Sequence, residues 1–376
     1  MSVVVCICLI GIIYCFFGYP AFVYMYSKNR SSNRRQWQYP DKDISVLMVV
    51  CNESESIQRK ISNILNLNYE QTRIHLVIVD DASDDNTVSL INGFEDDRIT
   101  LIQSENRQGK SSGINRGMEV INTELVLLLD ARQVVSQNVL YDLSSWFYPG
   151  CRVAAVSGEL KFRKVDGSMP SGMDAYQKYE KIIRRSEARI KSVPGVSGAI
   201  YMLRRDLFEP IPVDTILDDV LIPMNAARNG DWIGFDERAI AWDIPSDDME
   251  REKRRKTRTL NGNYQLLFRN ISWCVPKQHP VWFSYVSHKV MRLVAPFLAI
   301  IAITLSIILA TEGSVLFIVL SLSLSIGVLM YPLSLYFKFI NKNKLMRIGT
   351  SFVALNWFNL LGFTQFLFSD KKQSWK

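Results

Sequence analysis

Carboxylate side chains gather in three short turns in the middle of the chain: Val79 to Thr87 (VDDASDDNT), Leu127 to Arg132 (LLLDAR) and Thr215 to Val220 (TILDDV). An ionised carboxylate can accept hydrogen bonds from a base or a ribose, hold a divalent cation, or take a proton from a reacting hydroxyl. Apolar segments long enough to cross a bilayer lie on both sides of this block. The three acidic turns are therefore the first candidates for the residues of a functional site.

Short apolar runs alternate with amphipathic segments through the first half of the block. The predicted strands are Ile44 to Val50, Ile74 to Val79, Ile99 to Ile102 and Leu125 to Leu129. The first helix predicted between them carries Ile57, Ile61, Ile64 and Leu65 on a single face. A second is capped within Asp84 to Thr87 and carries Val88, Leu90 and Ile91, and a third runs from about Lys110 to Ile121. This order predicts an α/β fold with a mostly parallel sheet flanked by helices.

The polar residues of interest follow these strands. Asn52 and Glu53 come after the first strand, Asp80 and Asp81 end the second, and Asp130 ends the fourth. Ligands of open parallel sheets bind beyond the carboxyl ends of the strands. We therefore expect these side chains to line one pocket.

The second half of the block has fewer regular signals. We expect a charged helix at Asp174 to Lys191 and a strand opened by small residues at Gly195 to Leu203. A helix with an acidic start follows at Asp219 to Arg228, and a basic helix at Met249 to Asn270. Aromatic and basic side chains alternate in Pro280 to Val294, which predicts a helix lying in the membrane interface.

The N-terminal segment from Val3 to Tyr26 carries no charged residue and is long enough to span a bilayer. A cleaved signal peptide is the alternative, but the basic start and the small-residue cleavage site of such peptides are absent. Basic residues follow at Lys28, Arg30, Arg34 and Arg35. Because short basic loops stay on the cytoplasmic side, we expect the middle block to be cytoplasmic, at a bacterial inner membrane.

Three more apolar stretches follow the block, at Leu293 to Leu309, Val315 to Tyr336 and Ile348 to Phe368. The last one precedes three lysines that would lie outside if it crossed fully, so it either spans the membrane or is re-entrant or interfacial. The expected organisation is an N-terminal transmembrane helix (1–27), a basic linker (28–43), a cytoplasmic domain (44–272), an interfacial helix (273–292), C-terminal transmembrane helices (293–370) and a tail (371–376).

Cysteine and histidine usage argues against several classes of site. The six cysteines contain no C-x-x-C pair, and the three histidines are far apart. A disulfide framework, a zinc cage and an HExxH-type site are therefore not expected. The net charge of +7 comes from basic residues near the apolar segments and in Arg251 to Arg258. Membrane surfaces and phosphates explain this distribution better than nucleic acid does.

These motifs together resemble the family 2 glycosyltransferases, over Ser45 to Gln265. Members of that family commonly begin with a strand ending in Asn-Glu, which is Asn52-Glu53 here. They continue with an Asp-Asp-x-Ser turn, here starting at Asp80, and a Gly-Lys-x-x-x-x-Asn segment, here starting at Gly109. The resemblance implies a GT-A fold and inverting transfer of a sugar from a nucleotide diphosphate. It also implies a nucleotide-sugar site made by Asn52, Glu53, Asp80, Asp81, Lys110 and Asp130.

Two of these contacts also have a physical basis in the residue types. Asp81 can accept from a base N–H or a ribose hydroxyl, and Lys110 offers a point charge for a phosphate. A solvated helix start is the alternative for Lys110.

Many relatives carry Asp-x-Asp where this chain has Asp130-Ala131-Arg132, and an arginine cannot ligate a cation. Two interpretations remain. Asp130 holds Mg²⁺ or Mn²⁺ together with water and diphosphate oxygens, or Arg132 supplies part of the positive charge itself. Because magnesium keeps several waters and often needs only one or two carboxylates, we expect a divalent ion at Asp130.

The third acidic turn supplies the expected catalytic base. Relatives place an acidic pair ahead of an apolar helix, and its second member deprotonates the acceptor hydroxyl, a role that here falls to Asp219. Its neighbour Asp218 lies on the diphosphate or acceptor side or is a simple helix cap. Gly198 belongs to a small-residue segment resembling the loop that approaches the acceptor in membrane-bound synthases, although a structural turn explains its glycines equally well.

The basic run Arg251 to Thr259 takes the place of the Gln-x-x-Arg-Trp motif of processive relatives. Arg258 matches the arginine, Arg255 replaces the glutamine and Thr259 replaces the tryptophan. Arg255 and Arg258 can stabilise the charge on a leaving diphosphate. The missing tryptophan weakens the case for processive synthesis, and acidic lipid headgroups suit the rest of the run.

The expected function is a membrane-bound inverting glycosyltransferase that uses a UDP-linked sugar and a lipid-linked or polysaccharide acceptor at the cytoplasmic membrane face. One alternative is transfer to a polyprenyl phosphate or another lipid, which gives a lipid-linked monosaccharide. Another is a catalytically silent membrane partner of a polysaccharide export assembly. A transporter is disfavoured because the predicted spans carry no intramembrane charge.

Overall fold

The computed structural model describes residues 1–30, 42–163, 174–244, 249–336 and 344–368. The expected C-terminal tail and most of the basic linker lie outside these residues. Within them, the chain divides into two compact units. The sheet unit comprises Tyr26–Asp247 and Ser272–Phe283, and the helical unit comprises Met1–Met25, Asp248–Ile271 and Ser284–Ser369.

An eight-stranded sheet forms the core of the sheet unit, with strand order β3-β2-β1-β4-β7-β6-β8-β5. The strands are β1 Ile44–Val50, β2 Ile74–Asp80, β3 Ile99–Gln103, β4 Leu125–Leu129, β5 Val134–Val135, β6 Val153–Phe162, β7 Ile200–Arg204 and β8 Trp232–Asp243. The first four predicted strands, β1 to β4, are all parallel, as expected, and the strand predicted at Gly195 to Leu203 is β7. Beyond them β7 runs antiparallel to both β4 and β6, and β5 runs antiparallel to β8, so the sheet as a whole is mixed.

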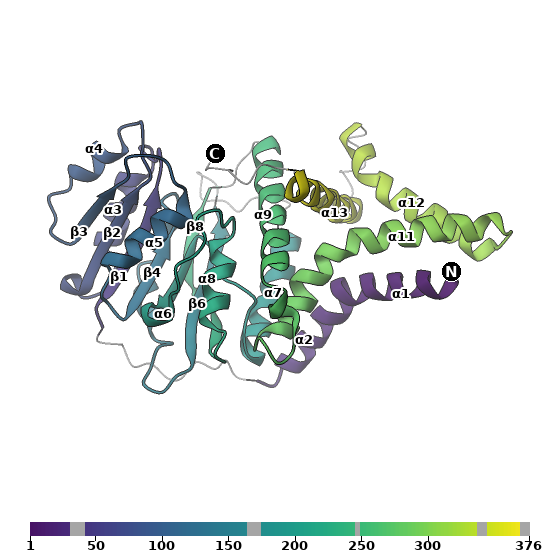
Figure 1. Cartoon of the computed structure of the whole chain (residues 1–376), viewed down its shortest axis with the longest axis horizontal. Coiled ribbons are helices and arrows are strands. Elements are labelled where there is room, and N and C mark those ends of the chain that lie inside the picture. The colour runs from purple at the N-terminus through teal and green to yellow at the C-terminus, as the bar shows by residue number, and fades with distance from the viewer. Residues whose placement is uncertain (31–41, 164–173, 245–248, 337–343, 369–376) are drawn as a thin grey trace. The chain divides into compact units, whose positions relative to one another are not determined.

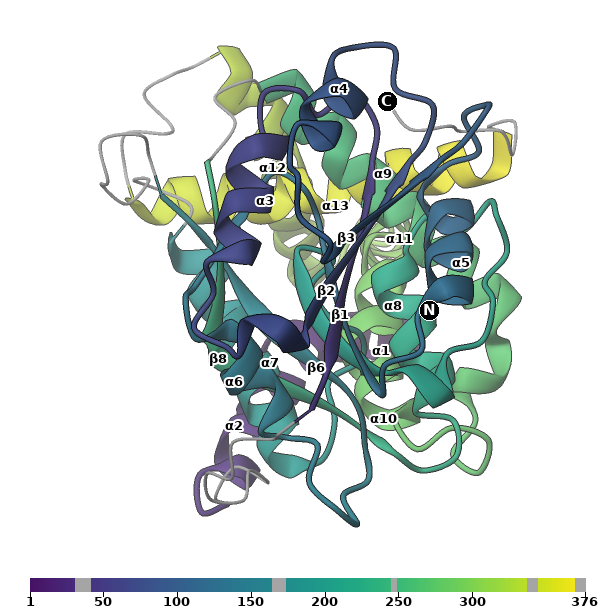
Figure 2. The ribbon, with the colours of Figure 1, turned by 90° about the vertical axis from the view of Figure 1, so that its left-hand side faces the viewer.

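Helices cover both faces of this sheet. They are α3 Ile57–Leu65, α4 Thr87–Asn92, α5 Lys110–Val120, α6 Val139–Ser144, α7 Asp174–Ile190 and α8 Asp218–Ala226, with 3-10 turns at Gln71–Arg73 and Arg205–Leu207. Figure 2 shows α3 and α5 on opposite sides of β1 and β2.

Alternation along β1 explains this arrangement, because successive side chains of a strand point to opposite faces. Val46 and Met48 belong to the same buried cluster as the apolar stripe of α3. Leu47 faces α5, where a methyl group on Gly117 would collide with it. The sheet is therefore buried on both sides, and its carboxyl edge is where polar groups remain accessible.

The helical unit contains most of the apolar helices (Figure 1). Its elements are α1 Ser2–Ile13, a π-helical turn Tyr14–Gly18, α2 Tyr19–Ser27, α9 Met249–Arg269, a π-helical segment Tyr285–Val290, α11 Met291–Thr311, α12 Val315–Tyr336 and α13 Lys344–Phe368. Three helices are long and apolar enough to cross a membrane, at Ser2–Ser27, Trp282–Thr311 and Val315–Ser334. The predicted N-terminal span and two of the C-terminal spans thus have helices to match. The last apolar stretch forms a shorter apolar helix over Phe352–Phe368.

The stretch expected to be an interfacial helix, 273–292, is divided among several elements of the structure, and its place at a membrane interface remains a prediction. A 3-10 turn ends at Cys274, and a single helix of 30 residues then runs from Trp282, through the short helix α10 (Trp282–Ser284), to Thr311. No proline or glycine interrupts the chain between Trp282 and Met291. Nothing in this stretch therefore stops the helical hydrogen bonds from continuing into α11.

A side chain repairs a broken hydrogen bond inside the helical unit. Pro296 lies within α11 and has no N–H for the carbonyl of Arg292 four residues earlier. The Asn359 side chain of α13 donates to that carbonyl at 2.8 Å. Tyr264 of α9 donates its hydroxyl to the Leu293 carbonyl at 3.0 Å and contacts the Asn359 amide oxygen at 2.6 Å. In an apolar environment such replacement partners are what make a helix-interior proline tolerable.

Candidate active site

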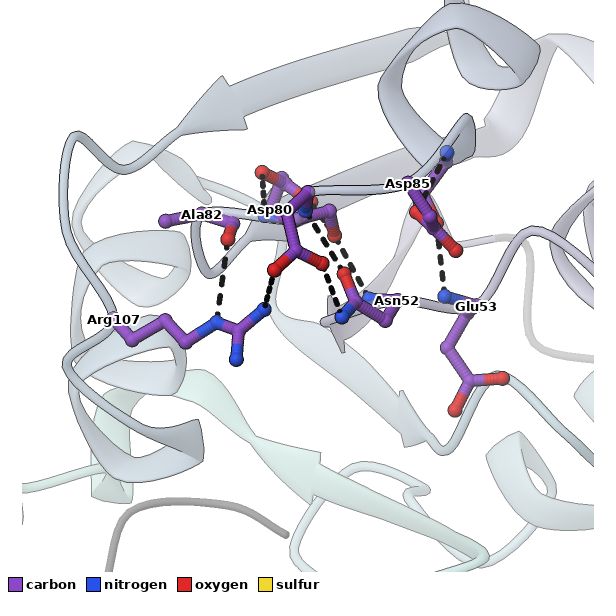
Figure 3. Close-up of polar contacts among 9 residues, drawn as sticks. Asn52, Glu53, Asp80, Ala82, Asp85 and Arg107 are labelled. Atoms are coloured by element: carbon purple, nitrogen blue, oxygen red, sulfur yellow. Dashed lines mark hydrogen bonds and ion pairs between the residues drawn. The ribbon is translucent and has the colours of Figure 1, made fainter.

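The loop after β1 is tied to the turn after β2 (Figure 3). Asn52 adopts a φ of 57°, in the left-handed region that asparagine tolerates better than most residues. Its side chain donates to Asp84 Oδ1 at 2.6 Å, and its amide oxygen accepts from the Asp84 N–H at 2.9 Å. The Glu53 N–H donates to Thr87 Oγ1 at 2.8 Å, and the Glu53 carboxylate accepts from Ser56 Oγ at 2.5 Å. Asn52 and Glu53 thus stabilise the loop, and their contact with a nucleotide remains a prediction.

The acidic pair at the end of β2 is buried, with Asp80 and Asp81 each 2% exposed. Asp80 accepts from the Ser83 N–H at 3.1 Å and closes the turn. Asp81 accepts from the N–H groups of Gln108 and Gly109 at 2.7 and 2.9 Å. Asp81 therefore fixes the start of α5, and the contact with a base or ribose predicted for it would have to use the remaining lone pairs of its oxygens.

Lys110, the first residue of α5, brings two of the acidic motifs together. Its Nζ lies 2.8 Å from Asp130 Oδ1 at the end of β4 and 3.3 Å from Asp218 Oδ2 at the start of α8. Burial by itself would lower the pKa of the Lys110 ammonium, but the carboxylates of Asp130 and Asp218 outweigh that effect and raise this pKa above its usual value. Lys110 is thus an ion-paired, partly buried residue and not a solvated helix start, and its contact with a nucleotide remains a prediction.

The expected catalytic base, Asp219, lies on the first turn of α8. The Gly198 N–H donates to Asp219 Oδ2 at 3.2 Å, and the Val196 N–H donates to the Asp219 carbonyl at 2.9 Å. A methyl group on Gly198 would lie 3.3 Å from the same carboxylate oxygen. The small-residue segment therefore contacts the acidic pair, and a glycine at position 198 fits this contact without displacing the carboxylate.

Arg132 does not pair with Asp130. Its guanidinium donates to the Asp243 carboxylate at the end of β8, Nε to Oδ1 at 3.0 Å and Nη2 to Oδ2 at 2.6 Å. The side chain of Asp243 is 1% exposed whereas that of Arg132 is 51% exposed. This two-bond pair holds the arginine at the rim of the loop after β4. The interpretation in which Arg132 replaces a metal would require this pair to be shared with the diphosphate.

Several residues near the site were not predicted. Lys60 of α3 is 1% exposed and donates to the Gln133 carbonyl at 2.7 Å, supporting the loop that follows Asp130. Burial lowers the pKa of Lys60 to about 7, and the charge of Asp130 opposes this shift only in part. A signal existed in the sequence, because position 60 falls within the apolar stripe of Ile57, Ile61 and Ile64.

Arg184 of α7 and Tyr201 of β7 also lie within electrostatic range of Asp219. Arg184 donates to Ser157 Oγ at 2.8 Å, and burial lowers the pKa of its guanidinium. The Tyr201 hydroxyl is buried and has no hydrogen-bond partner among the described residues. Neither residue stands out in the sequence, since the sheet register that brings them close is a tertiary property.

Arg255 and Arg258 lie in the exposed first half of α9, in the helical unit. Arg255 pairs with Glu252 of the same helix at 2.8 Å. Their predicted role at the diphosphate remains a prediction.

The carboxylates of the site offer few ligands for a metal. Among the described residues no group of three or more histidine, cysteine or acidic side chains could hold an ion. Asp130 has one oxygen on Lys110, and its side chain is 38% exposed. The buried Asp218 Oδ2 makes no hydrogen bond within the described chain. These oxygens suit a divalent ion that takes most of its ligands from water and a bound diphosphate, as Mg²⁺ commonly does.

Comparison with known proteins bears on the family and the fold. Residues 45–211 match the model for "Glycosyl transferase family 2". A poly-beta-1,6-N-acetyl-D-glucosamine synthase of Staphylococcus epidermidis is 23% identical over 351 residues, covering 92% of this chain and 79% of that protein. The synthase of the same name from Staphylococcus aureus strain COL is 24% identical over 245 residues, covering 64% of this chain and 59% of that protein.

A solved structure shares the fold. It is the mannosyltransferase PcManGT from Pyrobaculum calidifontis, in complex with GDP-Man and Mn²⁺, with a TM-score of 0.76, 19% identity and coverage of 98% of this chain and 99% of that one. The GT-A fold expected from the motifs is confirmed. Residues 45–211 thus form a family 2 glycosyltransferase domain, and the chain is similar to polysaccharide synthases.

Proposed function

We propose that the sheet unit transfers a sugar from a nucleoside diphosphate sugar to an acceptor hydroxyl with inversion at the anomeric carbon. The observation that carries this proposal is the meeting of Lys110 with Asp130 and Asp218, directly beside Asp219. It supports a site with a cation for the diphosphate next to a carboxylate for the acceptor. Both are needed when a sugar passes from one oxygen to another.

Asp219 accepts the proton of the acceptor hydroxyl as its oxygen attacks the anomeric carbon from the face opposite the diphosphate. A new C–O bond forms, the bond from the anomeric carbon to the diphosphate oxygen breaks, and the nucleoside diphosphate leaves with the electron pair. The Gly198 N–H orients the Asp219 carboxylate for this step. Lys110 lies on the diphosphate side, and Arg255 and Arg258 are further candidates to stabilise the leaving charge.

A divalent ion, Mg²⁺ or Mn²⁺, would be held by Asp130 and by diphosphate oxygens, where it neutralises negative charge on the leaving group. The Mn²⁺ in the complex of the structural neighbour PcManGT supports this part of the proposal. Asn52, Glu53, Asp80 and Asp81 would hold the nucleotide or the loops around it.

The donor is proposed to be UDP-linked, and the acceptor a polysaccharide or a lipid-linked glycan. The names of the synthase relatives support a glycan product. The structural neighbour was solved with GDP-Man, so a guanosine-linked donor is the first alternative to test. Three membrane-length helices and the basic residues Lys28 and Arg30 support a membrane protein with its sheet unit on the cytoplasmic side, at a bacterial inner membrane.

The test is release of nucleoside diphosphate by the purified chain in detergent, across a panel of UDP- and GDP-sugars, with Mg²⁺, Mn²⁺ or EDTA. Selective release from one donor that depends on Asp130 would support the assignment and identify the sugar. Sizing the product then separates a polymer from a lipid-linked monosaccharide, for which Thr259 in place of the tryptophan is the motivating observation. Donor binding without transfer to any acceptor would favour the silent partner instead.

A further inference from the structure

The ammonium of Lys110 occupies the space between the two acidic motifs. It lies 2.8 Å from Asp130 and 3.3 Å from Asp218, and Asp219 adds to the negative potential around it. The Lys110 side chain is 20% exposed, so it is partly withdrawn from water. A lysine here balances carboxylates that would otherwise repel each other.

The other nearby cations are committed elsewhere. Arg132 is held by the buried Asp243, and Lys60 donates to the Gln133 carbonyl. Within the described residues, Lys110 is therefore the cation in ion-pair contact with Asp130.

This placement conflicts with direct capture of a free divalent ion. An ion bound at Asp130 would have to share that carboxylate with the ammonium, and two positive charges a few ångström apart in a partly buried site repel strongly. The protein offers no cluster of three carboxylates to compensate within the described chain. A nucleoside diphosphate changes the balance, because it brings negative charge for Lys110 and oxygen ligands for the metal.

We propose that Lys110 is a built-in counter-cation that keeps free divalent metal off Asp130, so that the metal binds only together with a nucleoside diphosphate. This inference rests on the proposed function, since it requires the site to bind a nucleotide. It assigns Lys110 a positioning role that sets the order of binding, in addition to its place beside the diphosphate.

The experiment measures Mn²⁺ binding to the full chain in detergent by electron paramagnetic resonance, without nucleotide and with UDP or GDP. For the wild type we expect Mn²⁺ to bind at least tenfold more tightly when the nucleotide is present. The variant Lys110→Met removes the charge while keeping most of the length, and we expect it to bind Mn²⁺ without nucleotide at least tenfold more tightly than the wild type. Lys110→Arg keeps the charge and should behave as the wild type does.

Lys42→Met is the matched control, because Lys42 pairs with Glu124 at 2.5 Å on the surface of the same unit. It should leave Mn²⁺ binding unchanged. Equal Mn²⁺ affinity of the wild type with and without nucleotide overturns the inference, and this result does not depend on any variant folding. Nucleotide binding is measured separately by calorimetry in the presence of Mg²⁺. If neither UDP nor GDP binds, the proposed function fails. If a nucleotide binds and Mn²⁺ also binds tightly in its absence, only the role of Lys110 is overturned.

Discussion

The contact between Gly198 and Asp219 gives a sharp test of how the catalytic carboxylate is placed. In Gly198→Ala the new methyl carbon would lie 3.3 Å from Asp219 Oδ2 and 3.5 Å from Asp219 Cβ. The distance of 3.3 Å is shorter than an ordinary van der Waals contact, so the carboxylate must move by a few tenths of an ångström. The backbone N–H of residue 198, which donates to the carboxylate, is retained in the variant.

The expected effect follows from the size of that displacement. Since a misplacement of about 1 Å can cost about 100-fold in rate, we expect kcat to fall by roughly 3- to 30-fold in Gly198→Ala. Donor binding should change little because the methyl group faces Asp219 and not Lys110 or Asp130. Overpacking of this size should cost about 1 kcal/mol of stability or less, part of it offset by the lower entropy of the unfolded alanine chain.

The assay compares sugar transfer and donor affinity in Gly198→Ala with those in Gly93→Ala. Gly93 has a φ of −70°, and a methyl group there would lie 3.5 Å from the Leu90 carbonyl and 3.7 Å from the Ser89 carbonyl, both ordinary contacts. That control should keep its kcat. A Gly198→Ala enzyme with unchanged kcat, or one that loses donor affinity while its kcat is intact, would refute the placement of Asp219 at the acceptor.

Three further predictions concern residues that support the site or the helices. In Asp243→Asn the side chain keeps one acceptor oxygen for Arg132, Gln133 and the Ile244 N–H. We therefore expect the free energy of unfolding to fall by about 1–3 kcal/mol, measured as a lower Tm. An unchanged Tm would show that the pair of Arg132 and Asp243 does not stabilise the fold. Lys60 has a folded pKa of about 7 against about 10.4 when unfolded, so between these values the unfolded chain binds more protons and stability rises with pH by up to about 1.4 kcal/mol per unit. Lys60→Met should lack that rise between pH 7 and 9 in denaturation experiments, and parallel stability curves for both proteins would contradict the lowered pKa of Lys60. Asn359→Leu should destabilise the helical unit by about 1 kcal/mol. The loss should be smaller in a Pro296→Ala background, because the new N–H of residue 296 can donate to the Arg292 carbonyl. Equal losses in both backgrounds would show that the Asn359 side chain does not replace the hydrogen bond missing at Pro296.

The regular part of the fold could be predicted because local signals and tertiary structure agree there. The strand predicted at Ile44 to Val50 and the helix predicted from Lys110 to Ile121 match β1 and α5 to within a residue at each end. Both combine strong apolar periodicity with clear turn residues at their ends. Val315 to Tyr336 was equally well bounded, as an uninterrupted apolar run.

Of the second half of the sheet, only β7 was predicted, and strands β5, β6 and β8 were not. Strand β6 and strand β8 pair with register shifts that leave four residues of β8, from Asp236 to Ala239, without partners on β6. Such irregular pairing breaks the simple alternation that a sequence pattern detects. The partner of Arg132 was missed for the same reason, because Asp243 ends β8 and lies 111 residues away along the chain.

The candidate site was predicted as a set of motifs but not as a set of contacts. That Asp81 accepts from the backbone ahead of α5, and that Lys110 joins Asp130 to Asp218, follow from the packing of three loops. Residue types and spacing name these side chains, whereas the direction in which each points depends on the folded sheet.

The most direct test of the account is sugar transfer by Asp219→Asn, with donor binding measured on the same preparation. Asparagine keeps the shape of the side chain and can still accept from the Gly198 N–H, but it cannot take a proton from a hydroxyl. We expect donor affinity within about threefold of the wild type and a fall in transfer of at least about 100-fold, the lower range for loss of a general base. Transfer at the wild-type rate in Asp219→Asn would contradict the central claim that this carboxylate activates the acceptor.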